Sequence, residues 1–166
     1  MIIDTPSTVS QLIKTIQQAR SEWNALIEPI DQSKMTQPGV AGSWSIKDII
    51  AHITWHERQM VALIQAHALV GSELWNLPTD ERNAAIYSEV KDLPLEQVLE
   101  ESLEVNKQLI EVLPILSDQD LSNPEDFPGM PPDWMPGVII AQNTFEHYEQ
   151  HIPDVQRWKA DLSSTS

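Results

Sequence analysis

The sequence predicts an all-α protein that folds as an up-down four-helix bundle. Four long segments repeat apolar residues every three or four positions, and no useful length of chain alternates apolar and polar residues as a strand does. Pro, Gly, Asn and Asp collect between the long segments. A chain of 166 residues buries roughly 70% of its unfolded surface, so we expect a single domain that covers residues 1–166.

The first two expected helices cover residues 7–30 and 45–70. Apolar residues recur along the first at helical spacing, and the polar stretch after Pro29 ends it. The second begins at Ser45, because Ser45 and Asp48 have the spacing of an N-terminal capping box, and it ends before Gly71. Its apolar stripe consists of Ile49, Ile53, Met60, Leu63 and Ile64.

A short helix is expected after Pro78, and the third long helix is expected to start at Pro94, because proline is favoured at the first helical position. The inward positions of the third long helix are Leu95, Val98, Leu99, Leu103, Asn106, Leu109, Ile110 and Leu113, and Pro114 limits its end. Residues 117–133 are rich in Pro and predict an irregular surface connection. The fourth long helix is expected over residues 136–162.

All five histidines fall on inward stripes, with His52, His56 and His67 on the second helix and His147 and His151 on the fourth. Two imidazoles four residues apart project from one helix face, one turn apart, so both can reach one cation. Three neutral ligands leave coordination positions open, as in catalytic zinc-type sites. The pattern predicts a three-histidine metal site formed by His52, His147 and His151. The alternative is that these are core histidines with hydrogen-bond partners.

His56 forms a second H-x-x-x-H pair with His52, so it is either a rival ligand or a group that lines the pocket beside the ligands. Glu57 is the candidate general base or acceptor near a metal-bound water; a solvated glutamate on the helix flank is its alternative. Tyr148 either donates to a ligand or substrate or packs in the core. Trp134, on the Pro-rich connection, is placed to face a ligand.

Two further expectations concern the fourth helix. Glu146 and Glu149 flank the H-x-x-x-H pair and are expected to be surface charges. Pro153 removes a helical N–H two residues after His151, so the helix is expected to bend there.

Composition narrows the classes of function. The chain has no cysteine, which excludes a cysteine nucleophile, thiolate ligands and disulfides, so any thiol chemistry needs a thiol from the substrate. The net charge of -15 repels phosphates and anionic lipids, so we expect neither nucleic-acid nor membrane binding. No segment is a transmembrane candidate, and no basic apolar leader is present; we expect a cytoplasmic protein. No nucleotide-binding fingerprint appears.

Residues 44–53 (Trp-Ser-Ile-Lys-Asp-Ile-Ile-Ala-His-Ile), followed by Glu57, resemble the second-helix signature of the DinB/YfiT-like four-helix bundles. Residues 147–151 (His-Tyr-Glu-Gln-His) match the C-terminal H-x-x-x-H of the same superfamily. Residues 83–87 and 95–99 resemble the middle of its ClbS/DfsB branch. That branch frequently loses the second histidine of the pair, but this chain keeps it as His151.

The resemblance implies a bundle that binds a divalent ion, nickel or zinc, through His52, His147 and His151. Relatives include S-transferases that activate a low-molecular-weight thiol at the metal. The ClbS branch implies a protective protein that acts on a reactive electrophile.

We therefore expect a metal-dependent transferase or hydrolase that acts on a small electrophilic molecule, with a thiol as its candidate cosubstrate. A low-molecular-weight thiol needs cationic contacts for its carboxylates, and the candidates are Lys47, Arg58 and Arg82. The alternative is a metal-free binding or sequestration protein of the ClbS/DfsB type. We expect a homodimer in either case. A third hypothesis is that the protein acts only as a dimeric interaction module.

Overall fold

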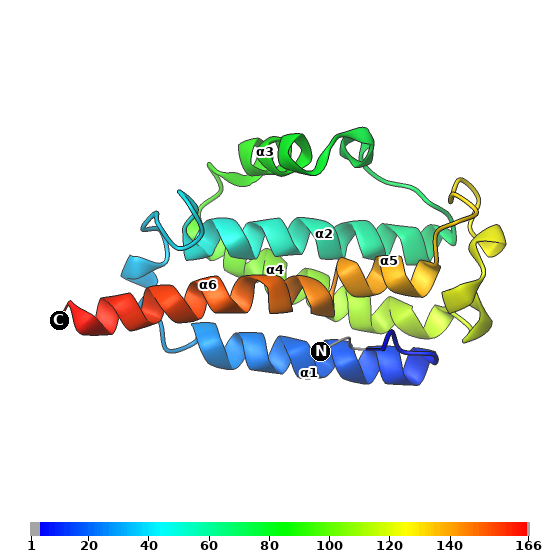
Figure 1. The fold of residues 1–166 in the computed structure, drawn as a ribbon, viewed down its shortest axis with the longest axis horizontal. Coiled ribbons are helices and arrows are strands. Elements are labelled where there is room, and N and C mark those ends of the chain that lie inside the picture. The colour runs from blue at the N-terminus through cyan, green and yellow to red at the C-terminus, as the bar shows by residue number, and fades with distance from the viewer. Residues whose placement is uncertain (1–3, 166) are drawn as a thin grey trace.

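The computed structural model describes residues 4–165, and these residues form helices joined by turns and loops (Figure 1). The long helices are α1 (Val9–Ile27), α2 (Ile46–Ala66), α4 (Leu95–Val112) and α6 (Phe145–Ser164). Helix α2 packs on α4, α1 packs on α6, and α2 also contacts α6. Apart from one isolated bridge, no β-structure occurs between residues 4 and 165. The predicted all-α helical bundle is confirmed.

Short 3-10 turns lie in the connections: η1 (Gln32–Lys34), η2 (Glu73–Asn76), η3 (Leu113–Ile115), η4 (Gln119–Ser122) and η5 (Pro124–Asp126). Two of them fall within residues 117–133, which otherwise form the irregular connection that the prolines predict. None of the described helices combines the length and the apolar character that crossing a membrane requires.

Helix α2 begins as its sequence predicts but ends earlier. The Ser45 side chain accepts from the Asp48 N–H and the Asp48 carboxylate accepts from the Ser45 N–H, which completes the capping box. The helix ends at His67, which adopts a left-handed conformation with φ 49°. The His67 ring stacks on Phe127 and its Nε2 lies 3.3 Å from Asp120 Oδ1, so His67 is remote from the other histidines.

Helix α3 (Thr79–Val90) lies over the outer side of α2 (Figure 1). Because α4 and α6 contact α2 from other directions, every residue from Asp48 to Glu57 is buried. A helix that is covered all round places polar side chains in a desolvated environment, where each needs a partner. The histidines of α2 therefore sit in the interior of the molecule.

The inward face of α4 agrees with the predicted one at Val98, Leu109 and Leu113, which are buried. Leu103 is the exception, because its side chain is 65% exposed. The other buried positions of the helix are Ser102, Val105 and Val112. The Ser102 hydroxyl accepts from Arg20 Nη2 at 3.0 Å, and the spacing of apolar residues could not predict the burial of this polar residue.

The expected fourth helix is two helices, α5 (Pro136–Gln142) and α6, so its predicted continuity is wrong. The break lies at Asn143 and Thr144, where Thr144 has φ -129° and ψ -104°. The Thr144 hydroxyl donates to the Ile140 carbonyl at 2.6 Å, and the Asn143 amide donates to the Ile139 carbonyl at 2.8 Å. These side chains satisfy carbonyls at the end of α5. Helix α6 then continues through Pro153, so the interruption precedes the histidine pair.

Candidate metal centre

Four histidines from two helices converge inside the bundle. His52 and His56 lie one turn apart on α2, and His147 and His151 lie one turn apart on α6. One ring nitrogen from each of His52, His147 and His151 lies within 4.8 Å of the other two. The His56 ring is packed against His52 and His147, with centroids 4.7 and 4.5 Å away.

The imidazoles of the cluster are desolvated. His52, His56 and His147 are buried and His151 is partly buried. Burial lowers the pKa of His52 to about 2 and that of His56 to about 4, and it lowers the pKa of His147 and His151 as well; neighbouring histidines add to the effect at His52 and His147. The rings are therefore neutral near pH 7, and a neutral imidazole is the form that binds a metal.

The donor atoms fit a divalent ion. His52 Nδ1, His147 Nδ1 and both ring nitrogens of His151 are buried without a hydrogen-bond partner among the described residues. In a tetrahedral site, metal–nitrogen bonds of about 2.0–2.1 Å place the ligand nitrogens about 3.4 Å apart, so the imidazoles would have to move closer by up to about 1 Å to bind one ion. Buried polar atoms without partners are costly, and a shared cation would satisfy these.

His56 has a partner that fixes its tautomer. Asn143 donates through its amide nitrogen to the Ile139 carbonyl, so its oxygen is left to accept from His56 Nδ1 at 2.8 Å. The proton of His56 is then on Nδ1, and its Nε2 carries a lone pair. That Nε2 is buried without a partner. His56 thus presents an acceptor beside the three candidate ligands, and Asn143 is a site residue that the sequence analysis missed.

A cavity of about 780 Å³ opens from the histidine cluster. The Trp44 ring lies 4.9 Å from the His52 ring, and Trp134 lines the cavity as its place on the Pro-rich connection suggested. Glu146 is partly buried and also lines the cavity, whereas Glu149 is exposed, as expected of a surface charge. Further lining residues come from the segment around α3 and from α5, and include Trp75, Thr79, Arg82, Asn83, Met135, Val138 and Ile139.

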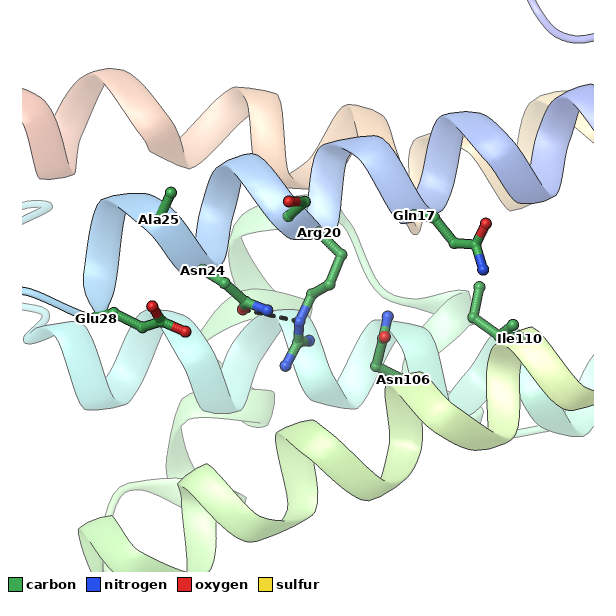
Figure 2. Close-up of a pocket in the computed structure, with 8 residues that line it drawn as sticks. Gln17, Arg20, Asn24, Ala25, Glu28, Asn106 and Ile110 are labelled. Atoms are coloured by element: carbon green, nitrogen blue, oxygen red, sulfur yellow. Dashed lines mark hydrogen bonds between the residues drawn. The ribbon is translucent and has the colours of Figure 1, made fainter.

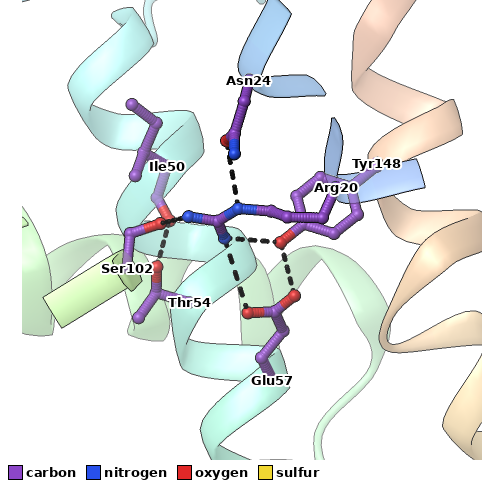
Figure 3. A network of polar contacts seen from close by, with 7 residues as sticks. All are labelled: Arg20, Asn24, Ile50, Thr54, Glu57, Ser102 and Tyr148. Carbon is purple, nitrogen blue, oxygen red and sulfur yellow. Dashed lines mark hydrogen bonds and ion pairs between the residues drawn. The ribbon is translucent and has the colours of Figure 1, made fainter. Parts of the chain in front are cut away.

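Glu57 and Tyr148 do not line this cavity; they belong to a separate buried network (Figure 3). The Tyr148 hydroxyl donates to Glu57 and accepts from Arg20 Nη1 at 2.8 Å, and Arg20 lies 3.9 Å from the Glu57 carboxylate. Burial raises the pKa of both Glu57 and Tyr148. Glu57 is fully buried, so it is not the solvated glutamate that was the alternative.

Arg20 organises this network, and the sequence analysis passed over it. Its Nε donates to Asn24 and its Nη2 to Ser102, so the guanidinium joins α1, α2, α4 and α6 (Figure 3). The helical spacing of the sequence could have indicated that Arg20 is buried. Arg20 lies four residues after Ile16 and seven before Ile27, on the buried stripe of α1. A charged residue at such a position needs buried partners.

A shallower depression of about 440 Å³ lies between α1 and α4 (Figure 2). Arg20, Asn24 and Asn106 line it together with Gln17, Glu28 and Ile110. It shares no lining residue with the histidine cavity, and the donors of Arg20 are already used within the protein. The histidine cavity is therefore the better candidate for chemistry.

The model of the DinB superfamily matches residues 15–153, which include both histidine pairs, and the chain belongs to this superfamily. The superfamily includes metal-dependent enzymes as well as proteins of the ClbS/DfsB type. The resemblance seen in the sequence is thereby confirmed. No curated protein matches the sequence.

Solved structures share the fold over most of their length. DfsB, a sibling lethal factor precursor, is 20% identical with a TM-score of 0.75 and coverage of 93% of this chain and 96% of its own. The colibactin self-resistance protein ClbS, in complex with double-stranded DNA, is 17% identical with a TM-score of 0.74 and coverage of 92% and 95%. A Streptococcus pneumoniae protein is 13% identical with a TM-score of 0.80 and coverage of 96% and 94%.

Proposed function

We propose that this protein is a divalent-metal-dependent transferase or hydrolase that acts on a small electrophilic molecule. The observation that carries the proposal is the convergence of His52, His147 and His151, whose ring nitrogens lie within 4.8 Å of one another at a cavity of about 780 Å³. Nickel and zinc both suit such a set of imidazoles. Superfamily membership supports the proposal, because it includes metal-dependent enzymes.

The three histidines would hold the ion, which when bound supplies Lewis acidity that lowers the pKa of a water or thiol. His56 Nε2 is an acceptor for a donor group of the substrate, held in place by Asn143. Trp44, Trp75 and Trp134 line the cavity and give it apolar walls. Glu57 is not assigned the role of general base, because it faces Arg20 and Tyr148 instead of the cavity.

Elemental analysis of protein purified without an affinity tag or chelator tests the proposal. We expect about one nickel or zinc ion per wild-type chain and its loss in His151→Ala. The matched control is His67→Ala, which removes a histidine whose Nε2 lies 3.3 Å from Asp120 Oδ1 and which does not line the cavity. Absence of metal from the wild type, even after incubation with divalent ions, would contradict the proposal. Equal metal in wild type and His151→Ala would contradict it as well.

The alternative function is metal-free protective binding or sequestration, as in the ClbS/DfsB type. Three tryptophans around a cavity of this size favour it, because aromatic side chains hold small organic ligands without any metal. Binding of an electrophile to metal-free protein without turnover would support this alternative over the enzyme.

We propose a small-molecule substrate, with a low-molecular-weight thiol as a candidate cosubstrate, and a homodimer. ClbS was solved with double-stranded DNA, but the net charge of -15 here opposes binding to phosphates. We therefore expect no shift of duplex DNA in a gel at low salt; a shift that falls with salt would contradict this expectation.

A further inference from the structure

Among the cations predicted to contact a substrate, Arg82 alone lines the histidine cavity. Lys47 Nζ donates to two backbone carbonyls after the end of α3, at 2.7 and 2.9 Å. Arg58 pairs with Glu101 at 3.0 Å on the surface. The placement of Arg82 is notable because the chain has 25 acidic and only 10 basic residues.

Arg82 has no carboxylate partner among the described residues, despite this excess of acids. Its Nε is buried without a hydrogen bond, and its Nη2 makes only a long contact of 3.4 Å with Thr79 Oγ1. The guanidinium lies over the Trp75 ring, 5.2 Å from the centroid. Stacking on an aromatic ring orients a guanidinium. Its N–H donors lie in the plane of the guanidinium and stay free to bind an anion.

Arg82 and the histidines line the same cavity from different helices: Arg82 comes from α3, and the histidines come from α2 and α6. A ligand in the cavity can therefore contact the guanidinium as well as the imidazoles. Aromatic and aliphatic side chains also line the cavity, with Trp44, Trp75, Trp134 and Ile139 among them.

Two carboxylates on the cavity wall limit the charge of such a ligand. Asp133 and Glu146 line the same cavity, and the chain as a whole is strongly acidic. A dianion such as a phosphate ester would be repelled by these charges at two sites. A single carboxylate needs only the one guanidinium, whose fork of N–H donors matches its two oxygens.

We propose that the cavity binds a small organic molecule with a planar apolar body and one carboxylate, and that Arg82 binds the carboxylate. This inference rests on the proposed function, because it takes the histidine end of the same cavity as the reactive end. It adds the substrate class and the orientation of the substrate: the carboxylate lies toward α3, and the opposite end of the molecule lies toward α2 and α6.

Isothermal titration calorimetry on the whole 166-residue chain tests the inference with phenylacetate and its neutral amide, phenylacetamide. We expect wild-type protein to bind the carboxylate at least about tenfold more tightly than the amide, since charge-assisted bonds are the stronger ones. Arg82→Gln should abolish this preference, and Arg82→Lys should keep part of it. The matched control is Arg58→Gln, which removes the same charge from the surface and should bind like wild type.

Equal affinity of wild type for the two probes, or no binding of either, would overturn the inference. So would a preference for the carboxylate that survives in Arg82→Gln. Each titration is made on protein with and without added metal, and each variant is checked by circular dichroism and metal content. A preference that depends on Arg82 in metal-free protein supports the anion site even if the metal proposal fails. If Arg82→Gln retains metal and still prefers phenylacetate over phenylacetamide, the anion site is refuted and the metal proposal is not.

Discussion

Glu57 lies 3.9 Å from Arg20 in the interior, and the two charges depend on each other. Both residues are buried, and Tyr148 bridges them through one hydrogen bond to each. A buried ion pair often adds little net stability, because desolvation offsets the attraction. Removing one partner has a larger effect, because the other charge is left in the interior without compensation.

We therefore expect Glu57→Ala to lower the free energy of unfolding by about 3–5 kcal/mol, since it leaves the Arg20 guanidinium without its carboxylate. Glu57→Gln should lower it by less, because the amide oxygen still accepts from Tyr148. Urea denaturation followed by circular dichroism measures both values. The metal content of folded Glu57→Gln should equal that of wild type, because Glu57 lies outside the cavity. Loss of metal in a stable Glu57→Gln protein would contradict a purely structural role.

Glu57 also predicts a dependence of stability on pH. Burial raises its pKa in the folded protein above the ordinary value of 4.5, so the folded state binds this proton more tightly than the unfolded state does. The carboxyl is neutral in both states at lower pH, and its contribution to stability is lost as the pH rises from about 4.5 through the folded pKa. The difference in free energy of unfolding between wild type and Glu57→Gln (wild type minus variant) should decrease as the pH rises from about 4.5 through the folded pKa of Glu57. A difference that is constant with pH would contradict the prediction.

At the scale of the helices, the break between α5 and α6 determines how the second histidine pair is presented. Helix α6 starts at Phe145, only two residues before His147. The break is maintained by side chains: Thr144 and Asn143 each donate to a carbonyl of α5. Asn143 also accepts from His56, so one amide connects the end of α5 to the histidine cluster.

Asn143→Ala should therefore lower the free energy of unfolding by about 1–3 kcal/mol, because it leaves His56 Nδ1 buried without a partner. The matched control is Gln142→Ala, at the neighbouring exposed position, whose effect should stay within about 0.5 kcal/mol. Thermal and chemical denaturation measure both. If the two variants are equally stable, the hydrogen bond between Asn143 and His56 does not hold the ring.

The sequence predicted the elements whose signals are local. Helix starts at Ser45 and after Pro94 follow from capping and from proline, and the irregular connection follows from its proline content. The break at Asn143 was not predictable in this way, because side chains that bond back to carbonyls of the preceding turn leave the apolar spacing intact. The burial of Ser102 on α4 was not predicted, because the inward face was assigned from apolar residues alone.

In the candidate site, too, the residues with a local sequence signal were predicted and those placed by tertiary packing were not. Helical spacing indicated that the two pairs, His52 with His56 and His147 with His151, each share one face, and the structure places both pairs in one cluster. Arg82 was named as one of three cations, yet only tertiary packing brings it to the cavity. Arg20 gave a weaker signal, a charge on an apolar stripe. Residues that act through partners far along the chain leave no local pattern.

At the scale of the whole molecule, metal binding should be linked to folding. An ion that binds the native histidine cluster and not the unfolded chain stabilises the protein by about 2.7 kcal/mol when its concentration is a hundred times the dissociation constant. We expect nickel or zinc to raise the Tm of wild type and to leave the Tm of His147→Ala unchanged. His67→Ala should respond like wild type, because His67 lies away from the cluster. A similar rise in all three proteins would indicate nonspecific binding.

The complete covering of α2 between Asp48 and Glu57 limits where this protein can change over evolution. Any larger or smaller side chain on that stretch disturbs a packed neighbour, whichever way it points. The opposite wall of the cavity is built from the segment around α3 and from the residues that lead into α5, where several lining residues are only partly buried. A new substrate preference would therefore arise by substitution there, while α2 keeps its histidines in place.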